Sequence, residues 1–154
     1  APFLRVRSID LDKELMKTKI AEALALKPYI RFAYLFGSQA KGAAGVLSDI
    51  DIAVFFGETA TYVQESIYGL ESELVLELEK SLEAGRVDLV VLNKARIFLR
   101  YQVLKGGEII YCCSEEERVR FHEETIRSYL DFQPFRAIQN SYLQKRIEEG
   151  AFGR

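Results

Sequence analysis

The sequence predicts a small mixed α/β fold, in which helices flank a β-sheet and a helical extension follows at the C-terminal end. Two observations lead to this prediction. Short apolar runs alternate with segments of helical period over most of the chain, and the last part has helical period throughout. The chain has 154 residues, enough for one domain that buries a hydrophobic core without disulfide bonds.

The first elements are a helix and two strands. Asp10 is a helix-capping residue type, and apolar residues at helical spacing follow it over 11–26 until a proline ends the pattern. Over 29–36, Ile30, Phe32 and Tyr34 then alternate with Arg31, Ala33 and Leu35, which predicts a strand. A polar, glycine-rich stretch separates it from a second apolar run, 50–56, which we predict to be the next strand.

The middle of the chain predicts a crossover unit. Apolar residues recur at steps of three and four over 61–83, which predicts a helix. The nearly continuous apolar run 87–92 predicts a buried strand. A strand–helix–strand unit makes its two strands parallel. Asn93 can cap a further helix over 95–105.

The remaining elements are an edge strand and two helices. Residues 108–112 predict the edge strand. Ser114 and Glu117 form a capping-box pattern that starts a helix running to about residue 130. Pro134 separates that helix from a last one over 135–149.

These elements divide the chain into two parts. We expect a core domain over 1–112 and a C-terminal helical extension, 113–154, packed on the same domain.

Composition excludes several classes of partner. The formal net charge is −2, from 21 basic and 23 acidic residues. Proteins that coat nucleic acid or bind membranes through basic residues need a strongly positive surface, so we expect no DNA, RNA or membrane partner. The adjacent Cys112 and Cys113 disfavour a disulfide bond between them, and free thiols are typical of the cytoplasm, where we expect the protein.

A glycine turn follows the first predicted strand. In the stretch from Phe36 to Gly42, Gly37 and Ser38 lie between a strand and a short predicted helix. Such a turn directs backbone N–H groups at one point and can cradle a phosphate. Lys41 would add a mobile positive charge, although a solvated surface lysine explains it almost as well.

Three carboxylates are expected at the same end of the sheet. Asp49 and Asp51 stand at the start of strand 50–56 and share a face, and Asp88 lies near the start of strand 87–92. Like charges this close repel, and a divalent cation with oxygen ligands offsets the repulsion. If strand 29–36 is antiparallel to strand 50–56, the Gly37-Ser38 turn reaches this end as well.

Each feature alone also has a purely structural explanation. A Gly-Ser turn is often only a turn, and an Asp-x-Asp pair is often a solvated strand end. Asp88 could form a salt bridge with Arg86 or Lys94. The shared position of all three features at one sheet edge favours a functional site.

The spacing of these residues resembles the signature of the DNA polymerase β-like nucleotidyltransferase superfamily: Gly37-Ser38, ten residues, then Asp49-Ile50-Asp51. Within it, the chain is similar to the minimal nucleotidyltransferases, the MntA-type antitoxin partners of HEPN-domain toxins. The similarity runs from about 30 to 95, where 86–90 resembles the strand of the third carboxylate. The helical tail from 96 onward is similar to that subgroup in size and pattern but carries no signature.

The resemblance implies a polymerase β-like fold and a role for each motif residue. Gly37 and Ser38 would hold the nucleoside triphosphate. Asp49 and Asp51 would bind two Mg²⁺ ions, with Mn²⁺ as an alternative. Asp88 would help to hold one metal ion and would act as base on the acceptor hydroxyl.

The implied reaction moves AMP from ATP, or the equivalent group from another nucleoside triphosphate, to a tyrosine hydroxyl of a HEPN-type toxin. The protein would thereby be the antitoxin. Two alternatives stay open: a small-molecule nucleotidyltransferase of the aminoglycoside-modifying kind, and an antitoxin that acts by binding alone. The preferred base, the number of groups transferred, self-association and the roles of His122 and the two cysteines also stay open.

Overall fold

The protein is built on one four-stranded mixed sheet. The computed structural model describes residues 2–37, 49–57, 64–82 and 86–148. Within them the strand order is β3-β2-β1-β4, formed by β1 (Ile30–Phe36), β2 (Ile50–Phe56), β3 (Val87–Val91) and β4 (Glu108–Cys112). Strand β1 is antiparallel to both β2 and β4, whereas β2 and β3 are parallel. The predicted parallel crossover and the predicted edge strand are therefore confirmed.

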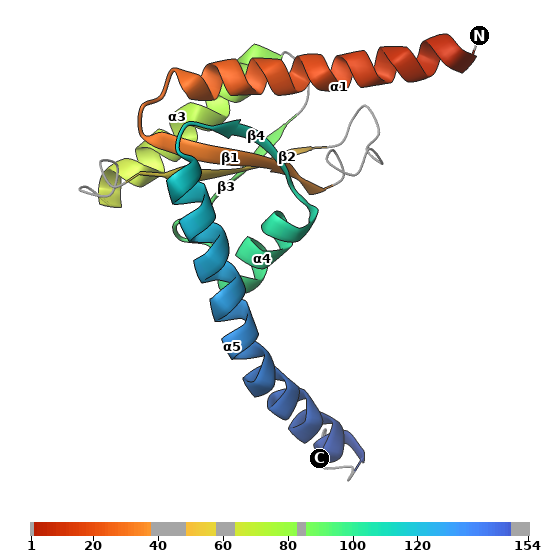
Figure 1. Cartoon of the computed structure of the whole chain (residues 1–154), viewed down its shortest axis with the longest axis vertical. Coiled ribbons are helices and arrows are strands. Elements are labelled where there is room, and N and C mark those ends of the chain that lie inside the picture. The colour runs from red at the N-terminus through yellow and green to blue at the C-terminus, as the bar shows by residue number, and fades with distance from the viewer. Residues whose placement is uncertain (1, 38–48, 58–63, 83–85, 149–154) are drawn as a thin grey trace.

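Helices α1 (Pro2–Ala25) and α3 (Gln64–Leu82) cover one face of the sheet (Figure 1). Strand residues alternate between faces, and the even-numbered residues of β2 point toward this layer. The larger buried cluster forms here, from Ile20 and Leu24 of α1, Ala33 and Leu35 of β1, Ile50, Ile52, Val54 and Phe56 of β2, and Leu74 and Leu78 of α3. The helical period of α3 thus reflects one apolar side that packs on the sheet.

Helix α4 (Ile97–Gly106) and the first turns of α5 (Glu115–Glu148) cover the other face. The second buried cluster contains Phe32 and Tyr34 of β1, Ala53 of β2, Leu92, Val103 of α4 and Phe121 of α5. The rings of Phe32 and Phe55 stack with centroids 4.8 Å apart. The odd-numbered residues of β2 belong to this face, which is where Asp51 also points.

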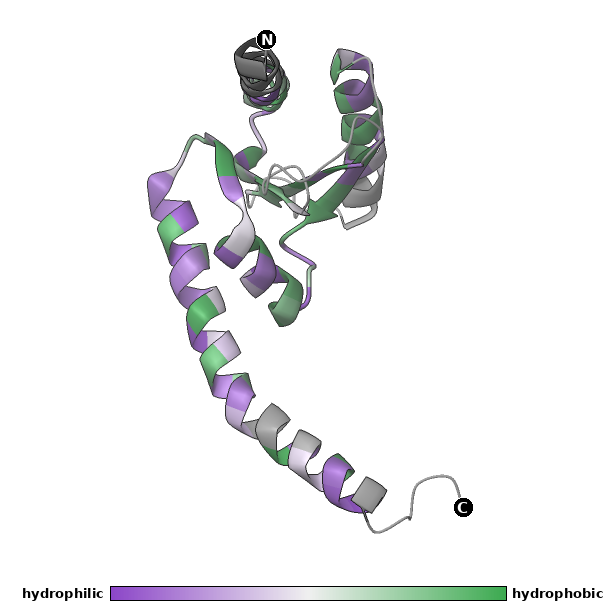
Figure 2. Cartoon of the chain, turned by 90° about the vertical axis from the view of Figure 1, so that its right-hand side faces the viewer, coloured by the Kyte–Doolittle hydropathy of each residue, from purple (hydrophilic) through white to green (hydrophobic). Residues whose placement is uncertain are grey.

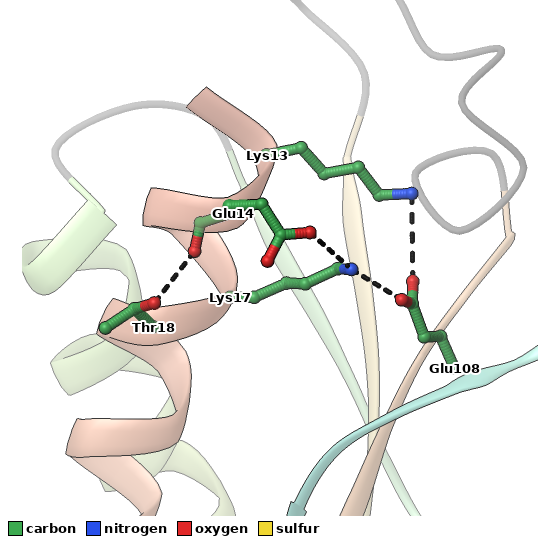
Figure 3. A network of polar contacts seen from close by, with 5 residues as sticks. All are labelled: Lys13, Glu14, Lys17, Thr18 and Glu108. Atoms are coloured by element: carbon green, nitrogen blue, oxygen red, sulfur yellow. Dashed lines mark hydrogen bonds and ion pairs between the residues drawn. The ribbon is translucent and has the colours of Figure 1, made fainter. Parts of the chain in front are cut away.

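A polar network joins α1 to the edge strand (Figure 3). The ammonium of Lys17 donates to a carboxylate oxygen of Glu108 at 2.5 Å and to Glu14 at 3.2 Å. Lys13 lies 3.7 Å from the other oxygen of Glu108. The hydrogen bond from Lys17 lowers the pKa of Glu108, and the same bond raises the pKa of Lys17. This network ties the start of β4 to the helix that crosses it.

Three predicted details are wrong. Helix α1 begins at Pro2, so Asp10 lies inside the helix and does not cap it. The residue that precedes α4 is Arg96, with no side-chain cap. The side chain of Asn93 instead exchanges two hydrogen bonds of 2.8 Å with the backbone of Phe56, and so extends the pairing beyond the end of β2.

The third detail is the break predicted at Pro134. Helix α5 runs through this residue without interruption from Glu115 to Glu148. Its predicted start is confirmed, because the backbone N–H of Glu117 donates to the Ser114 hydroxyl at 3.3 Å. Figures 1 and 2 show the second half of α5 extending away from the sheet, and Pro134 itself is exposed.

Candidate functional site

The Asp51 and Asp88 carboxylates come from neighbouring positions of two parallel strands. In the register of β2 with β3, Asp51 pairs with Asp88, one step after the pair Ile50–Val87. Neighbouring strands lie about 4.8 Å apart, and paired residues point to the same face. Both carboxylates therefore lie side by side where the two strands begin, on the face covered by α4 and α5.

Gly37 brings the end of β1 to the same place. Phe36 is the register partner of Asp51 across β1 and β2, so Gly37 follows directly beside it. Gly37 has a φ of 71°, a conformation that favours glycine. A Cβ atom on this residue would lie 2.2 Å from Oδ2 of Asp51. The backbone and the carboxylate are thus packed too closely for any side chain at position 37.

The charges at this edge act on Asp51. Its pKa is raised, chiefly because the side chain is partly buried, and further by the negative charges of Asp88 and Asp49. The side chain of Asp51 is half-buried, whereas Asp49 and Asp88 are exposed. The metal-free protein therefore keeps a repulsion among the three acidic groups that a bound cation would relieve.

This donor set suits magnesium. Mg²⁺ prefers oxygen ligands and usually takes one or two protein carboxylates, completing its shell with water and substrate phosphates. Within the described ranges, no group of three or more His, Cys, Asp and Glu side chains is arranged to hold a metal ion by itself. The aspartates at this edge fit an ion that shares its coordination with a phosphate ligand.

Two of the residues predicted for nucleotide binding, Ser38 and Lys41, lie outside the described residues. Lys94 was considered as a salt-bridge partner of Asp88. In the structure, the Lys94 ammonium lies 2.7 Å from a carboxylate oxygen of Glu71. His122, on α5, is exposed, as expected for a surface residue.

Sequence patterns did not indicate a hollow that lies at the opposite end of β2 from the aspartates. Its volume is about 380 Å³, and it is lined by Phe55, Phe56, Asn93, Arg100, Glu117, Arg120, Phe121 and Glu124. Burial lowers the pKa of Arg100, whose guanidinium donates to the backbone oxygen of Asn93 at 2.8 Å. Residues from separate segments form this hollow, so no local motif could have indicated it.

Among the described helices, none has both the length and the apolar character that crossing a bilayer requires.

Known proteins are similar to this chain in both sequence and fold. The chain is 32% identical to the protein adenylyltransferase MntA of Shewanella oneidensis over 106 residues, which cover 69% of this chain and 70% of the relative. It is 27% identical to the protein of the same name from Aphanizomenon flos-aquae, over 66% of this chain and 69% of the relative.

Solved structures of toxin–antitoxin complexes contain chains that are similar to this one in fold. A toxin–antitoxin complex with AMP-PNP contains a chain that superimposes with a TM-score of 0.67 at 31% identity, covering 82% of this chain and 98% of the other. A complex of tri-AMPylated Shewanella oneidensis HEPN toxin with MNT antitoxin gives a TM-score of 0.64 at 29% identity, covering 85% and 98%.

The family described as polymerase beta, nucleotidyltransferase, matches residues 18–116, which contain the Gly37 turn and all three aspartates. The match spans the whole sheet together with α3, α4 and the end of α1, and the resemblance seen in the motif spacing is thereby confirmed. The chain belongs to the polymerase beta nucleotidyltransferase family.

Proposed function

We propose that this protein is an antitoxin that transfers AMP from ATP to a tyrosine hydroxyl of a HEPN-type toxin. The observation that carries the proposal is the pairing of Asp51 with Asp88, directly beside the Gly37 turn. This edge combines acidic oxygen ligands with a glycine backbone that lies directly against one of them. Idle clustered carboxylates would only cost stability through their repulsion.

Each residue has a distinct part in the proposed reaction. Nucleotidyltransferases of this family use a divalent metal ion. We assign Asp49, Asp51 and Asp88 as its ligands and propose two Mg²⁺ ions, with Mn²⁺ as a substitute. When bound, the ions would neutralise charge on the attacking and leaving oxygens.

Asp88 would take the proton of the acceptor tyrosine as its oxygen attacks the α-phosphorus of ATP. The bond from that phosphorus to the pyrophosphate oxygen breaks, and pyrophosphate leaves. Gly37 and Ser38 would hold the triphosphate through backbone and hydroxyl donors, and Lys41 would neutralise the β- and γ-phosphates.

The relatives support the choice of nucleotide and acceptor. One similar structure is a toxin–antitoxin complex with AMP-PNP, and another contains an AMPylated HEPN toxin. A third is an MntA complex in which two aspartates, separated by one residue, are replaced by glutamate. That spacing is the spacing of Asp49 and Asp51 here.

We further propose a core domain over 1–112 and an extension over 113–154. The start of the extension packs on the core, because Phe121 and Thr125 of α5 are buried. A cytoplasmic location fits a reaction that consumes ATP, and it fits the free thiols of Cys112 and Cys113.

A labelling experiment tests the proposal. The protein would be incubated with Mg²⁺, one of four labelled nucleoside triphosphates and the product of the neighbouring gene. We expect the label of ATP on a tyrosine of that product, and none with Asp51→Asn, which keeps the side-chain volume but removes a metal ligand. Asp131→Asn, an exposed change on α5, is the matched control. Equal labelling by Asp51→Asn, or none by the unaltered protein, would refute the proposal.

A further inference from the structure

The second half of α5 carries an apolar surface that the rest of the described chain covers only in part. Its exposed apolar side chains are Leu130, Phe132, Ile138, Tyr142 and Leu143, with exposed fractions of 57%, 38%, 68%, 61% and 42%. Figure 2 shows hydrophobic positions continuing along the helix after it has left the sheet. A projecting helix of about this length is only marginally stable in water without packing.

This surface continues the side of α5 that packs on the core. Phe121, Phe132 and Leu143 are spaced eleven residues apart, which is about three helical turns, so they lie along one side of the helix. Their exposed fractions are 4%, 38% and 42%, and thus rise along this line. Ile138 and Tyr142, one turn apart, both lie to one side of this line, about a third and a quarter of a turn around the helix from it, and widen the apolar surface in that direction. The packing side of α5 therefore extends beyond the core it packs on.

The core end of this line is already an aromatic contact between helices. The Phe132 ring meets that of Phe98 of α4 at 5.3 Å, and the Tyr129 ring stacks on that of Tyr101 at 3.7 Å. A partner that continued this packing would contact α4 and the distal part of α5 together.

The layer of α4 and α5 lies on the same side of the sheet as the proposed catalytic carboxylates. Asp51 and Asp88 point to the side of the sheet that α4 and α5 cover, because Ala53 and Val90, which share their faces, pack in the second buried cluster. A protein that presents a tyrosine to these carboxylates must approach from this side. A second copy of the chain has no such requirement.

We propose that the distal apolar side of α5 is the docking surface for the acceptor protein, formed by Phe132, Ile138, Tyr142 and Leu143. This inference rests on the proposed function and adds where the partner binds. The partner would carry a complementary apolar surface at a distance from its acceptor tyrosine. Docking then raises the local concentration of the tyrosine at the carboxylates without taking part in the chemistry.

The test separates docking from catalysis. Ile138→Gln/Leu143→Gln removes two apolar side chains and introduces a good helix former. Gln133→Ala/Gln144→Ala, a pair of exposed polar residues eleven positions apart on the other side of the helix, is the control. Circular dichroism checks that α5 keeps its helicity in both. The readouts are the Kd for the toxin without nucleotide, and kcat and KM for AMP transfer to it.

We expect the apolar variant to raise both Kd and KM by about tenfold or more, with kcat unchanged and the control like the unaltered protein. Unchanged Kd and KM would overturn the docking inference. So would loss of self-association in the apolar variant with toxin binding intact, because a second copy would then cover the surface. If the unaltered protein binds the toxin but transfers no AMP, the proposed function fails, while the Kd comparison still decides the docking inference.

Discussion

Gly37 allows the backbone to lie directly against the Asp51 carboxylate. Gly37→Ala places a Cβ atom where Oδ2 of Asp51 lies, and the positive φ disfavours any side chain. The backbone conformation alone should cost about 1–2 kcal/mol of unfolding free energy. Displacement of Asp51 should lower AMP transfer by about a hundredfold. Urea denaturation and initial rates measure the two effects.

Gly69 of α3 provides the matched control. A Cβ at this helical position meets nothing within 4 Å. Gly69→Ala should therefore leave transfer unchanged and stabilise the protein by about 0.5–1 kcal/mol. If Gly37→Ala behaves like Gly69→Ala, the contact between turn and carboxylate has no catalytic importance.

Asp51 should make the stability of the metal-free protein depend on pH. Its pKa is raised in the folded state, so the protonated form favours folding. The stabilisation is complete below the ordinary pKa of 3.8 and is lost as the pH rises through the higher folded pKa. Asp51→Asn should therefore raise the melting temperature at pH 7, with a smaller gain at pH 4.

The effect of metal on the melting temperature gives a second test of the repulsion at Asp51. Mg²⁺ with ATP should raise the melting temperature of the unaltered protein and have little effect on Asp51→Asn. An equal shift in both would place the metal elsewhere, and a lower melting temperature of metal-free Asp51→Asn at pH 7 would contradict the repulsion.

The neighbouring positions of Asp51 and Asp88 could be predicted because motif spacing and strand period act together. Alternation puts Asp49 and Asp51 on one face, and the parallel crossover sets Asp88 beside Asp51. The contact of Gly37 with Asp51 could not be predicted, because it depends on the register between β1 and β2. The hollow beside Arg100 could not be predicted from the sequence either, because residues from separate segments line it.

At the scale of elements, the Glu108 network joins α1 to β4. The pKa of Glu108 is lowered in the folded state, so its contribution is present above the ordinary pKa and is lost as the pH falls through the folded value. Glu108→Gln should cost up to about 1 kcal/mol at pH 7 and almost nothing near pH 2. Denaturant titrations at both values measure this difference.

A substitution of Glu14 tests whether the loss in Glu108→Gln comes from the link to β4 or only from the removal of a negative charge near Lys17. Its side chain is 70% exposed and contacts the same Lys17. Glu14→Gln should therefore change the free energy of unfolding by less than Glu108→Gln. Equal losses from the two variants would show that the link to β4 adds nothing.

The boundaries of a helix or strand were predictable where a local sequence pattern alone determines them. Strand β2 and the start of α5 follow from apolar run and capping box alone. The break at Pro134 was wrong because an exposed proline inside a long helix removes one hydrogen bond without removing the neighbouring turns. Asn93 was misassigned because its amide bonds the backbone of Phe56, a partner far away in the sequence.

At the scale of the whole molecule, the two layers have different tasks in the proposed mechanism. The layer of α1 and α3 buries the larger cluster and supports the sheet. The layer of α4 and α5 lies on the face of Asp51 and Asp88 and extends beyond the sheet (Figure 1). Catalysis and partner binding would thus occur on one side of a sheet that is stabilised from the other.

The stoichiometry of toxin neutralisation tests the central claim, enzymatic modification, most directly. Increasing amounts of the protein, with ATP and Mg²⁺, would be added to a fixed amount of toxin, followed by removal of the protein and measurement of toxin activity and mass. We predict that far less than one copy per toxin silences it lastingly, that the toxin is heavier by one AMP or a small multiple, and that Asp51→Asn loses this effect. Toxin that regains full activity once the protein is removed, with its mass unchanged, after treatment with either the unaltered protein or Asp51→Asn, would contradict the account.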